Sequence, residues 1–292
     1  GGVNYFSPDR NGVVHYDYQA GNRSNLYYSY IGEMVEDKHG NLWISTDGGG
    51  ISCVNENWEL IHQFTAGHQN SIPYNNIKSI CYDEKNDYLY IGTHLGGLSR
   101  YDIQKNQFYN YQEHSSRGNL APHNFIYQVK MWNGKLYLSS REGIFLLDPV
   151  SNLFTFLFKP DSYCTNFDID DAGNLYVNQS DEIIIVSLYD LSQKRSVPIQ
   201  KMGYQGGIAR ILAVKDGAYV CTLGSGLLFY NRHTKKIIAY NTSNSELSSN
   251  YCYNMKKTTD NKFILTGDQG ITLFNSLEQT FIRLVQKEIY LK

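Results

Sequence analysis

The sequence predicts an all-β fold, a β-propeller of four-stranded antiparallel blades with six complete blades and an incomplete seventh. The first observation is a recurring phrase: a polar turn, an aromatic, a branched residue, a hydroxyl residue, glycines and an aliphatic residue. The second is its period. The aromatic anchors are 47, 47, 39, 43 and 44 residues apart, at Trp43, Tyr90, Tyr137, Tyr176, Tyr219 and Phe263. Short β segments repeating at this period are typical of propellers.

Composition is the third observation. Aromatic residues make up 14% of the 292 residues, with 25 Tyr, and glycine (25) is far more frequent than proline (6). This mixture suits pleated strands joined by tight turns. Apolar residues make up 41%, which is enough for a continuous core in one large domain.

Each repeat divides into four short strands. In the second complete repeat we expect strands at 77–83, 88–93, 98–102 and 108–111, joined by turns at 84–87, 94–97 and 104–106. A polar residue closes the third strand in five repeats, and its side chain is expected to cap the following turn: Asn55, Asp102, Asp148, Asn231 and Asn275. The glycine before the third strand fits a turn that needs positive φ.

Applied along the chain, this pattern predicts one propeller domain covering 1–292. We expect outer strands of an incomplete blade within 1–20 and complete blades at about 26–66, 72–113, 120–160, 163–200, 204–242 and 247–286. The fourth repeat is degenerate. There 178–182 replaces the usual Thr–Gly–Gly turn, and 188–198 is expected to be a longer connection.

Charge and hydropathy exclude some functions. Only 18% of residues are charged, the net charge is −2 and no basic block exists, so no nucleic-acid partner is expected. No apolar run approaches the roughly 18 residues that cross a bilayer. The first residues, Gly1–Phe6, match the middle of the repeat at Gly49–Val54, which suggests a segment of a longer polypeptide. Any membrane contact would then come from segments outside this one.

The cysteines show no metal-binding spacing. All five lie in strand patterns and are expected to be buried free thiols, with one disulfide between neighbouring blades as the alternative: Cys53, Cys81, Cys164, Cys221 and Cys252. The eight histidines are scattered over turns. No metal or cofactor is therefore expected.

No catalytic constellation is evident. Gly224–Gly226 resembles a nucleophile turn only loosely and lacks the strand–elbow–helix context. Acidic residues cluster at 168–171 and at 181–182, but the topology places these two groups on opposite faces, whereas a glycosidase pair must converge within about 5–10 Å. No catalytic residue is expected.

Binding is the better hypothesis. On a propeller, the loops entering each first strand and the turns joining the second strand to the third lie on one face. The candidate ligand-binding residues on these segments are Tyr30, Asp47, Asn76, His94, Asn124, Tyr127, Arg141, Arg210, Tyr253 and Asp268, with Asp181 and Asn250 beside them. Polar groups with tyrosine platforms suit sugar recognition. Arg141 and His94 are favoured because their turns otherwise use small residues. The alternative is that these residues only shape turns.

A different surface suggests a protein partner. The segment Phe154–Phe158 carries aromatics at alternate positions of an outer strand, and an outer strand is an edge that invites pairing. A second propeller or a dimer mate would contact its outward positions. The simpler interpretation is burial against the neighbouring blade.

The phrases at Asp37–Ile51 and Asp83–Leu98 resemble the two-component regulator propeller repeat, and weaker copies cover nearly the whole chain. That repeat builds the extracytoplasmic sensors of hybrid two-component systems in gut Bacteroidetes. The resemblance implies a periplasmic module, part of the ectodomain of an inner-membrane protein, that recognises an oligosaccharide and signals to a histidine kinase outside this segment. A glycan hydrolase or lyase and a protein–protein scaffold are the alternatives.

Overall fold

The recurring phrase forms the same structure in each repeat, a strand, a tight turn and a second strand. The computed structural model describes residues 3–6, 13–16, 28, 30–111, 124–258 and 262–284. Within this part of the chain the regular elements are 26 β-strands and the short 3₁₀ helix η1 (Gln200–Met202). The chain is organised as two units, Gly1–Pro160 and Asp161–Lys292. No helix in the described residues is long and apolar enough to span a membrane.

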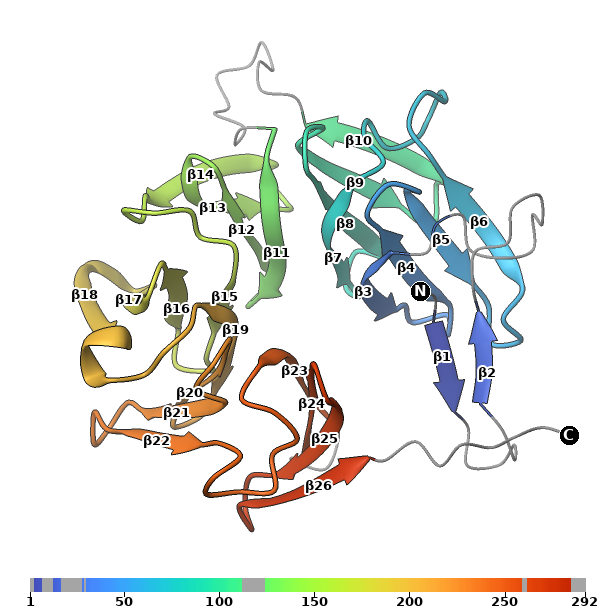
Figure 1. Ribbon diagram of the computed structural model, residues 1–292. Helices are drawn as coiled ribbons and strands as arrows, with labels where there is room; N and C mark the ends of the chain where they lie inside the picture. The colour runs from blue at the N-terminus through green and yellow to red at the C-terminus, as the bar shows by residue number, and fades with distance from the viewer. Residues whose placement is uncertain are drawn as a thin grey trace, which may run out of the picture. The chain divides into compact units, whose positions relative to one another are not determined.

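Unit 1 contains three four-stranded antiparallel sheets, which are the first three blades (Figure 1). Blade one consists of β3 (Ile31–Glu36), β4 (Leu42–Thr46), β5 (Ile51–Val54) and β6 (Leu60–Phe64). Blade two consists of β7 (Ile77–Asp83), β8 (Tyr88–Thr93), β9 (Leu98–Asp102) and β10 (Gln107–Tyr111). Blade three consists of β11 (Ile126–Trp132), β12 (Lys135–Ser140), β13 (Gly143–Asp148) and β14 (Leu153–Phe158).

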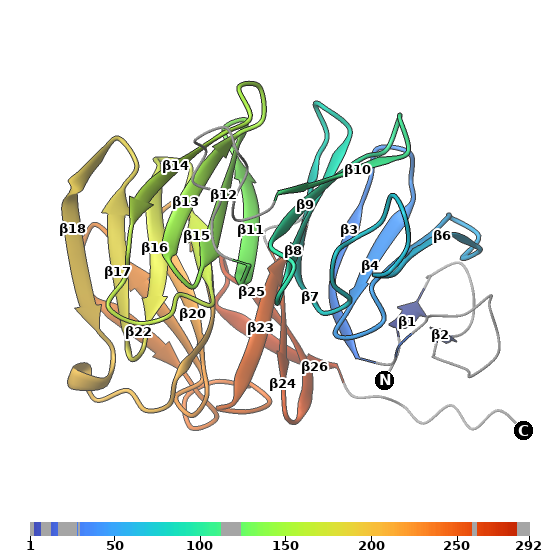
Figure 2. The ribbon, with the colours of Figure 1, turned by 90° about the horizontal axis from the view of Figure 1, so that it is seen from above.

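Unit 2 contains the other three blades. Blade four consists of β15 (Phe167–Ile169), β16 (Asn174–Gln179), β17 (Glu182–Ser187) and β18 (Asp190–Pro198). Blade five consists of β19 (Ile208–Val214), β20 (Gly217–Thr222), β21 (Leu227–Asn231) and β22 (Ile237–Tyr240). Blade six consists of β23 (Cys252–Lys257), β24 (Lys262–Gly267), β25 (Gly270–Asn275) and β26 (Thr280–Leu284). Strands follow chain order in every four-stranded sheet, as can be followed for blade four, β15 to β18, in Figure 2.

The all-β class and the six four-stranded propeller blades are confirmed. The described residues contain no seventh four-stranded sheet. Instead β1 (Val3–Phe6) and β2 (Val13–Tyr16) pair as a two-stranded sheet. That they belong to an incomplete seventh blade, and that 1–292 is one domain, stay predictions. The predicted blade bounds at 26, 113, 120 and 286, and the rest of 1–20, lie outside the described residues.

One element was predicted wrongly. The segment expected as a long connection in blade four, 188–198, is a hairpin turn followed by the nine-residue strand β18, which pairs with β17. Seven of its nine residues are exposed. Because both faces of this outermost strand meet solvent over most of its length, the sequence has none of the apolar alternation that marks a half-buried strand.

A hydroxyl residue explains the recurring shape of the turn between the second and third strands. The Thr46 hydroxyl donates to the Gly50 carbonyl oxygen (2.9 Å) and accepts from the Gly49 N–H (3.0 Å). The same pair of bonds recurs at Thr93, Ser140 and Thr222. These side chains are buried, so the hydrogen bonds satisfy groups that water cannot reach. Each of these turns is therefore stabilised from within by its own hydroxyl residue.

The aspartate that opens the phrase fixes the aromatic anchor. The Trp43 indole Nε1–H donates to Asp37 Oδ2 (2.9 Å), while Asp37 Oδ1 accepts from the backbone N–H groups of His39 and Asn41. In blade four Asp170 repeats this arrangement and accepts from the Tyr176 hydroxyl (3.2 Å). The carboxylate thus closes the turn and satisfies the polar tip of a buried ring.

The predicted caps of the third strands are confirmed. A side-chain oxygen accepts from a backbone N–H two to four residues later at Asn55, Asp102, Asp148, Asn231 and Asn275. All five cysteines are free, and four of them are buried. Burial raises the pKa of the Cys81 thiol to about 11 and that of Cys252 to about 12, so both remain protonated at neutral pH.

Polar side chains connect the innermost strands of neighbouring blades within each unit. In unit 1, Glu33 Oε2 accepts from the Ser79 hydroxyl (2.6 Å) and the Ile80 N–H (3.1 Å), and Ser79 Oγ accepts from the Val129 N–H (3.1 Å). In unit 2, Asp168 Oδ2 accepts from the Ala213 N–H (2.8 Å). The first strand of a blade is a sheet edge with unpaired N–H groups, and these bonds satisfy them.

Replacing Ser79 with alanine is expected to lower the free energy of unfolding by about 1–3 kcal/mol. The change leaves the buried Val129 N–H without its acceptor and removes one donor from Glu33. Urea denaturation would measure the effect, with the exposed Ser243→Ala as the control. A loss equal to that of the control would contradict a stabilising role for this connection.

Candidate functional site

A continuous strip of polar and aromatic residues crosses the turns of unit 1. We call it the turn strip, and it consists of Tyr28, Tyr30, Asp47, Asn76, Lys78, His94, Phe125 and Arg141. Its members come from the loops entering first strands, from β7, and from turns between second and third strands. Five of the predicted residues belong to it. The strip is built by the short contacts between adjacent blades that follow.

Asp47 lies at the centre of the first junction. It forms an isolated antiparallel bridge with Asn76, and Asp47 Oδ1 accepts from the Asn76 side-chain amide (2.8 Å) and from Lys78 Nζ (3.1 Å). The side chains of Asp47 and Lys78 remain 48% and 33% exposed, so both are accessible to a ligand. The turn of blade one therefore presents a paired carboxylate and ammonium at the entrance of blade two.

Asp47 is ionised at neutral pH. Burial acts most strongly and opposes ionisation, but hydrogen bonds from Lys78 and Asn76, with the charge interactions of Lys78 and His94, together lower the pKa of Asp47. The anion accepts hydrogen bonds without donating any. A hydroxyl group arriving beside it would donate to it.

Two tyrosines flank this junction. The Tyr30 carbonyl oxygen accepts from the Asp47 N–H (3.0 Å), and the rings of Tyr28 and Tyr30 lie 5.9 Å apart at 45°. Tyr28 is 36% exposed and Tyr30 is 70% exposed. The Tyr28 ring also lies against the turn glycine Gly48, where an added methyl group would be 3.0 Å from Cζ. These rings form an exposed aromatic platform next to a charged pair.

The second junction joins blades two and three. The His94 N–H donates to the Asn76 carbonyl oxygen (3.0 Å), and the His94 ring meets the Phe125 ring edge-on at 4.9 Å. The Arg141 N–H donates to the Phe125 carbonyl oxygen (3.2 Å), and its guanidinium lies 5.6 Å from the Phe125 ring centroid. The structure thus brings the two favoured residues, His94 and Arg141, into contact with one aromatic ring.

The other predicted residues of unit 1 have different surroundings. Asn124 is half-buried, and its carbonyl oxygen accepts from the Gly97 N–H (2.9 Å), so its backbone helps to shape the turn of blade two. Tyr127 is half-buried in β11, at the position where the register of β11 on β12 shifts. Both residues therefore contribute to the shape of blades two and three beside the turn strip.

Three predicted residues belong to unit 2 and are described there. Arg210 is half-buried in β19 opposite Cys221, Tyr253 is 49% exposed on β23, and Asp268 is exposed in the turn between β24 and β25. Asn250 closes the turn of blade five, since its carbonyl oxygen accepts from Gly224 and Gly226. The Asp181 carbonyl oxygen accepts from the Gln200 N–H (3.3 Å).

The acidic groups of blade four have structural roles. Asp168 and Asp170 are both buried, and Asp170 binds Asn174, Tyr176 and Arg232. No group of three or more His, Cys, Asp or Glu side chains in the described residues is arranged to hold a metal ion. On the outer strand β14, Phe154 packs edge-on against Tyr111 of blade two, whereas Phe156 is 49% exposed.

Sequence reasoning missed three members of the turn strip. Tyr28 precedes the predicted Tyr30 by two residues, so alternation along an extended segment would have placed them together. Lys78 lies two residues after Asn76 for the same reason. Phe125 stands next to Asn124, and only the contact between neighbouring blades reveals its position beside His94 and Arg141.

Comparison with known proteins supports the resemblance. Residues 28–48 match the family described as two component regulator propeller, which confirms the resemblance seen in the repeated phrase. The match covers the loop into β3, the first hairpin of blade one and the beginning of the turn strip. No curated protein matches the chain in sequence.

Three solved structures share the fold. The extracellular domain assigned to the hybrid two component system BT3049 of B. thetaiotaomicron is 20% identical with a TM-score of 0.70, over 88% of this chain and 35% of that chain. The extracellular domain assigned to the one component system BT4673 of B. thetaiotaomicron is 22% identical with a TM-score of 0.75, over 97% and 39%. The Myceliophteria thermophila Cps50 β-propeller domain is 10% identical with a TM-score of 0.62, over 88% and 87%.

Proposed function

We propose that this chain is a sensor propeller of a two-component regulator of the hybrid type and that it lies in the periplasm, outside the inner membrane. The two component regulator propeller match at residues 28–48 supports this proposal, as does the likeness to two extracellular domains from B. thetaiotaomicron. The chain spans well under half of those two domains. The histidine kinase and the membrane anchor would be contributed by other segments of the polypeptide.

The ligand we propose is an oligosaccharide that binds on the turn strip. The observation that carries this proposal is the combination of two exposed tyrosine rings with the hydrogen-bonded group of Asp47, Asn76 and Lys78 directly beside them. Sugars present apolar ring faces that stack on aromatic side chains, and hydroxyl groups that need both donors and acceptors. Farther along the strip, His94 and Arg141 offer further donors.

Signalling follows from the way the strip is assembled. It crosses three blades of unit 1, and its bonds run from the turn of one blade to the entering loop of the next. A ligand that spans the strip would favour one arrangement of these loops, and its differential affinity would set the size of the shift. We expect the changed arrangement of these loops to alter the packing against a second propeller or a dimer mate. No catalytic step is required of this chain.

Tyr30→Ala tests the platform. The variant is expected to weaken binding of a recognised oligosaccharide at least about tenfold, equivalent to about 1.4 kcal/mol, because it removes the most exposed ring of the strip. Calorimetric titration of a glycan panel on the whole chain would identify the ligand and then compare the variants. Tyr163→Ala is the matched control, since this tyrosine is 57% exposed in unit 2.

The other outcomes select the other functions. Turnover of a panel member would favour a glycan hydrolase or lyase. No binding to any glycan, together with stable dimers in light scattering, would favour a protein–protein scaffold. Equal affinity of the wild type, Tyr30→Ala and Tyr163→Ala would remove the turn strip as the site.

A further inference from the structure

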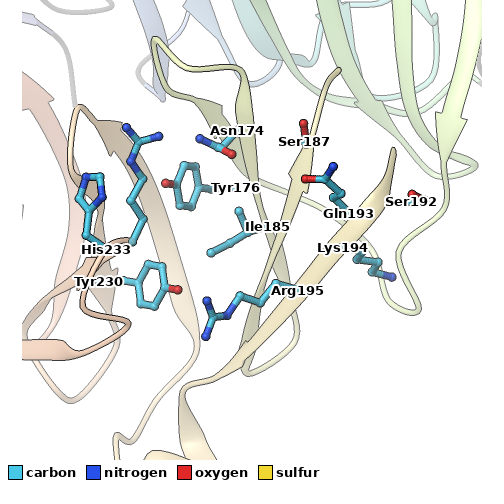
Figure 3. A pocket seen from close by; sticks show the side chains of 11 residues that line it. Asn174, Tyr176, Ile185, Ser187, Ser192, Gln193, Lys194, Arg195, Tyr230 and His233 are labelled. Carbon is cyan, nitrogen blue, oxygen red and sulfur yellow. The ribbon is translucent and has the colours of Figure 1, made fainter. Parts of the chain in front are cut away.

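Unit 2 contains an open pocket of about 540 Å³ between blades four and five (Figure 3). Its size lies within the range of small-molecule sites, about 300–1,000 Å³. None of the candidate ligand-binding residues predicted from the sequence lines this pocket. Its lining includes Asn174, Tyr176, Ile185, Arg195, Tyr230 and Arg232.

One buried carboxylate, that of Asp170, holds three of the lining side chains in place. Asp170 has a side-chain exposure of 0%, and it accepts from Asn174 Nδ2 (2.8 Å), the Tyr176 hydroxyl (3.2 Å) and Arg232 NH1 (3.3 Å). These hydrogen bonds compensate the negative charge of the buried Asp170 and fix the positions of three lining side chains. Pre-positioned polar groups of this kind lower the cost of ordering a site around a ligand.

Two further polar groups have no partner among the described residues. Tyr230 is only 2% exposed, and its hydroxyl makes no hydrogen bond within the described part of the chain. Arg195, on the exposed strand β18, likewise forms no ion pair or side-chain hydrogen bond with described residues. Figure 3 shows the Arg195 guanidinium and the Tyr230 hydroxyl pointing toward one another, with Ile185 near both tyrosine rings. The Tyr230 hydroxyl is thus available to a ligand oxygen, and the buried Nε–H of Arg232, which makes no hydrogen bond within the described residues, is a second donor without a partner.

The charges around the pocket favour an anion at this position. The cationic side chains of Lys194, Arg195 and Arg232 line it, and none of its described lining residues is acidic. The nearby acids are engaged elsewhere. Asp170 is paired with Arg232, and Asp216 lies 3.4 Å from His233. Asp190 accepts from the side chains of Ser192 and Gln193, and these bonds lower its pKa, so it stays ionised in its own turn. The Arg195 guanidinium is therefore available to bind an anion.

We propose that this pocket binds a polyhydroxylated carboxylate, the chemistry of a uronic acid. The carboxylate is held between the Arg195 guanidinium and the Tyr230 hydroxyl, because a guanidinium matches a carboxylate with two parallel hydrogen bonds and a phenol adds a third. The body of the ligand covers Ile185, and its hydroxyls meet the Asn174 amide and the neighbouring Ser187 and Gln193. This site is independent of the turn strip and of the ligand proposed there.

Glucuronic acid and glucose test the proposal, because they differ only in the carboxylate that replaces a primary alcohol. Chemical-shift titration of the whole isotope-labelled chain would measure both dissociation constants. Glucuronic acid is expected to bind at least about tenfold more tightly than glucose. Arg195→Gln is expected to remove at least about tenfold of that affinity, and Tyr230→Phe about three- to tenfold.

Two control variants distinguish this pocket from the turn strip and from a general effect of surface charge. Lys256→Gln removes the same charge from an exposed position on β23 and is expected to leave the dissociation constant unchanged. Tyr30→Ala is also expected to leave it unchanged, whatever that variant does to oligosaccharide binding. Equal affinity for glucose, an Arg195→Gln variant that binds as the wild type does, or inorganic sulfate binding as tightly as glucuronic acid would each overturn the proposal.

Discussion

Trp43→Ala is expected to lower the free energy of unfolding by about 3–5 kcal/mol, because it deletes a large buried ring from the core between blades one and two. Trp43 is 1% exposed. Its ring stacks on those of His62 (5.9 Å) and Phe64 (6.3 Å) and meets Tyr101 of blade two edge-on at 5.5 Å. The substitution opens a cavity in this aromatic cluster and removes the donor from Asp37.

Trp43→Phe separates the two contributions. Phenylalanine keeps an aromatic ring in the cluster but cannot donate to Asp37, so we expect a smaller loss of about 1–2 kcal/mol. Urea denaturation monitored by circular dichroism would measure all three proteins. A loss of less than about 1 kcal/mol for Trp43→Ala would show that the surrounding rings collapse to fill the space, and that the repeat does not depend on its anchor.

Gly50→Ala is expected to lower the free energy of unfolding by about 2–5 kcal/mol, from left-handed backbone strain and overpacking together. Gly50 has φ +78°, and an added methyl group would lie 2.1 Å from the Phe64 carbonyl oxygen on β6. That contact is too short for any side chain, so the backbone of the outer strand must move. The Gly50 N–H also donates to the Asn75 carbonyl oxygen (3.0 Å), next to the turn strip.

Gly40→Ala is the matched control for this variant. Gly40 has the same φ of +78°, but nothing lies within 4 Å of an added methyl group. Gly40→Ala should therefore lower the free energy of unfolding only by the cost of the left-handed backbone, about 1–2 kcal/mol. Denaturant unfolding of both variants measures the difference, and glycan titration shows whether the shift at Asn75 reaches the strip. Equal losses of unfolding free energy at the two positions would mean that β6 moves away from the added methyl group without destabilising the fold.

Much of the fold was predictable because the residues that determine each turn lie close together in the sequence. The hydroxyl residue, the glycine and the capping Asn or Asp act within a few residues of one another. A turn such as Thr93–Gly97 can therefore be predicted from the sequence. The same holds for strands half-buried between blades, whose apolar residues alternate. The first strand of blade two, predicted at 77–83, is observed at Ile77–Asp83.

Strands without an apolar pattern and contacts between neighbouring blades were not predictable in this way. The strand β18 is polar along most of its length, so its pairing with β17 leaves no periodic signal. The grouping of His94 and Arg141 around Phe125 arises from two junctions between blades. The pocket joins β16 and β18 of blade four to β21 of blade five, and no spacing in the sequence relates Arg195 to Tyr230.

The hydroxyl turn has a consequence for sequence variation among the repeats. The hydroxyls of Thr46, Thr93 and Thr222 bond to main-chain atoms of their own turns. The side chain of the next residue therefore takes no part in these bonds. Those successors are Asp47, His94 and Leu223, an acid, an imidazole and an aliphatic on equivalent scaffolds. The residue at this position can therefore vary from one repeat to the next without loss of the hydrogen bonds that form the turn.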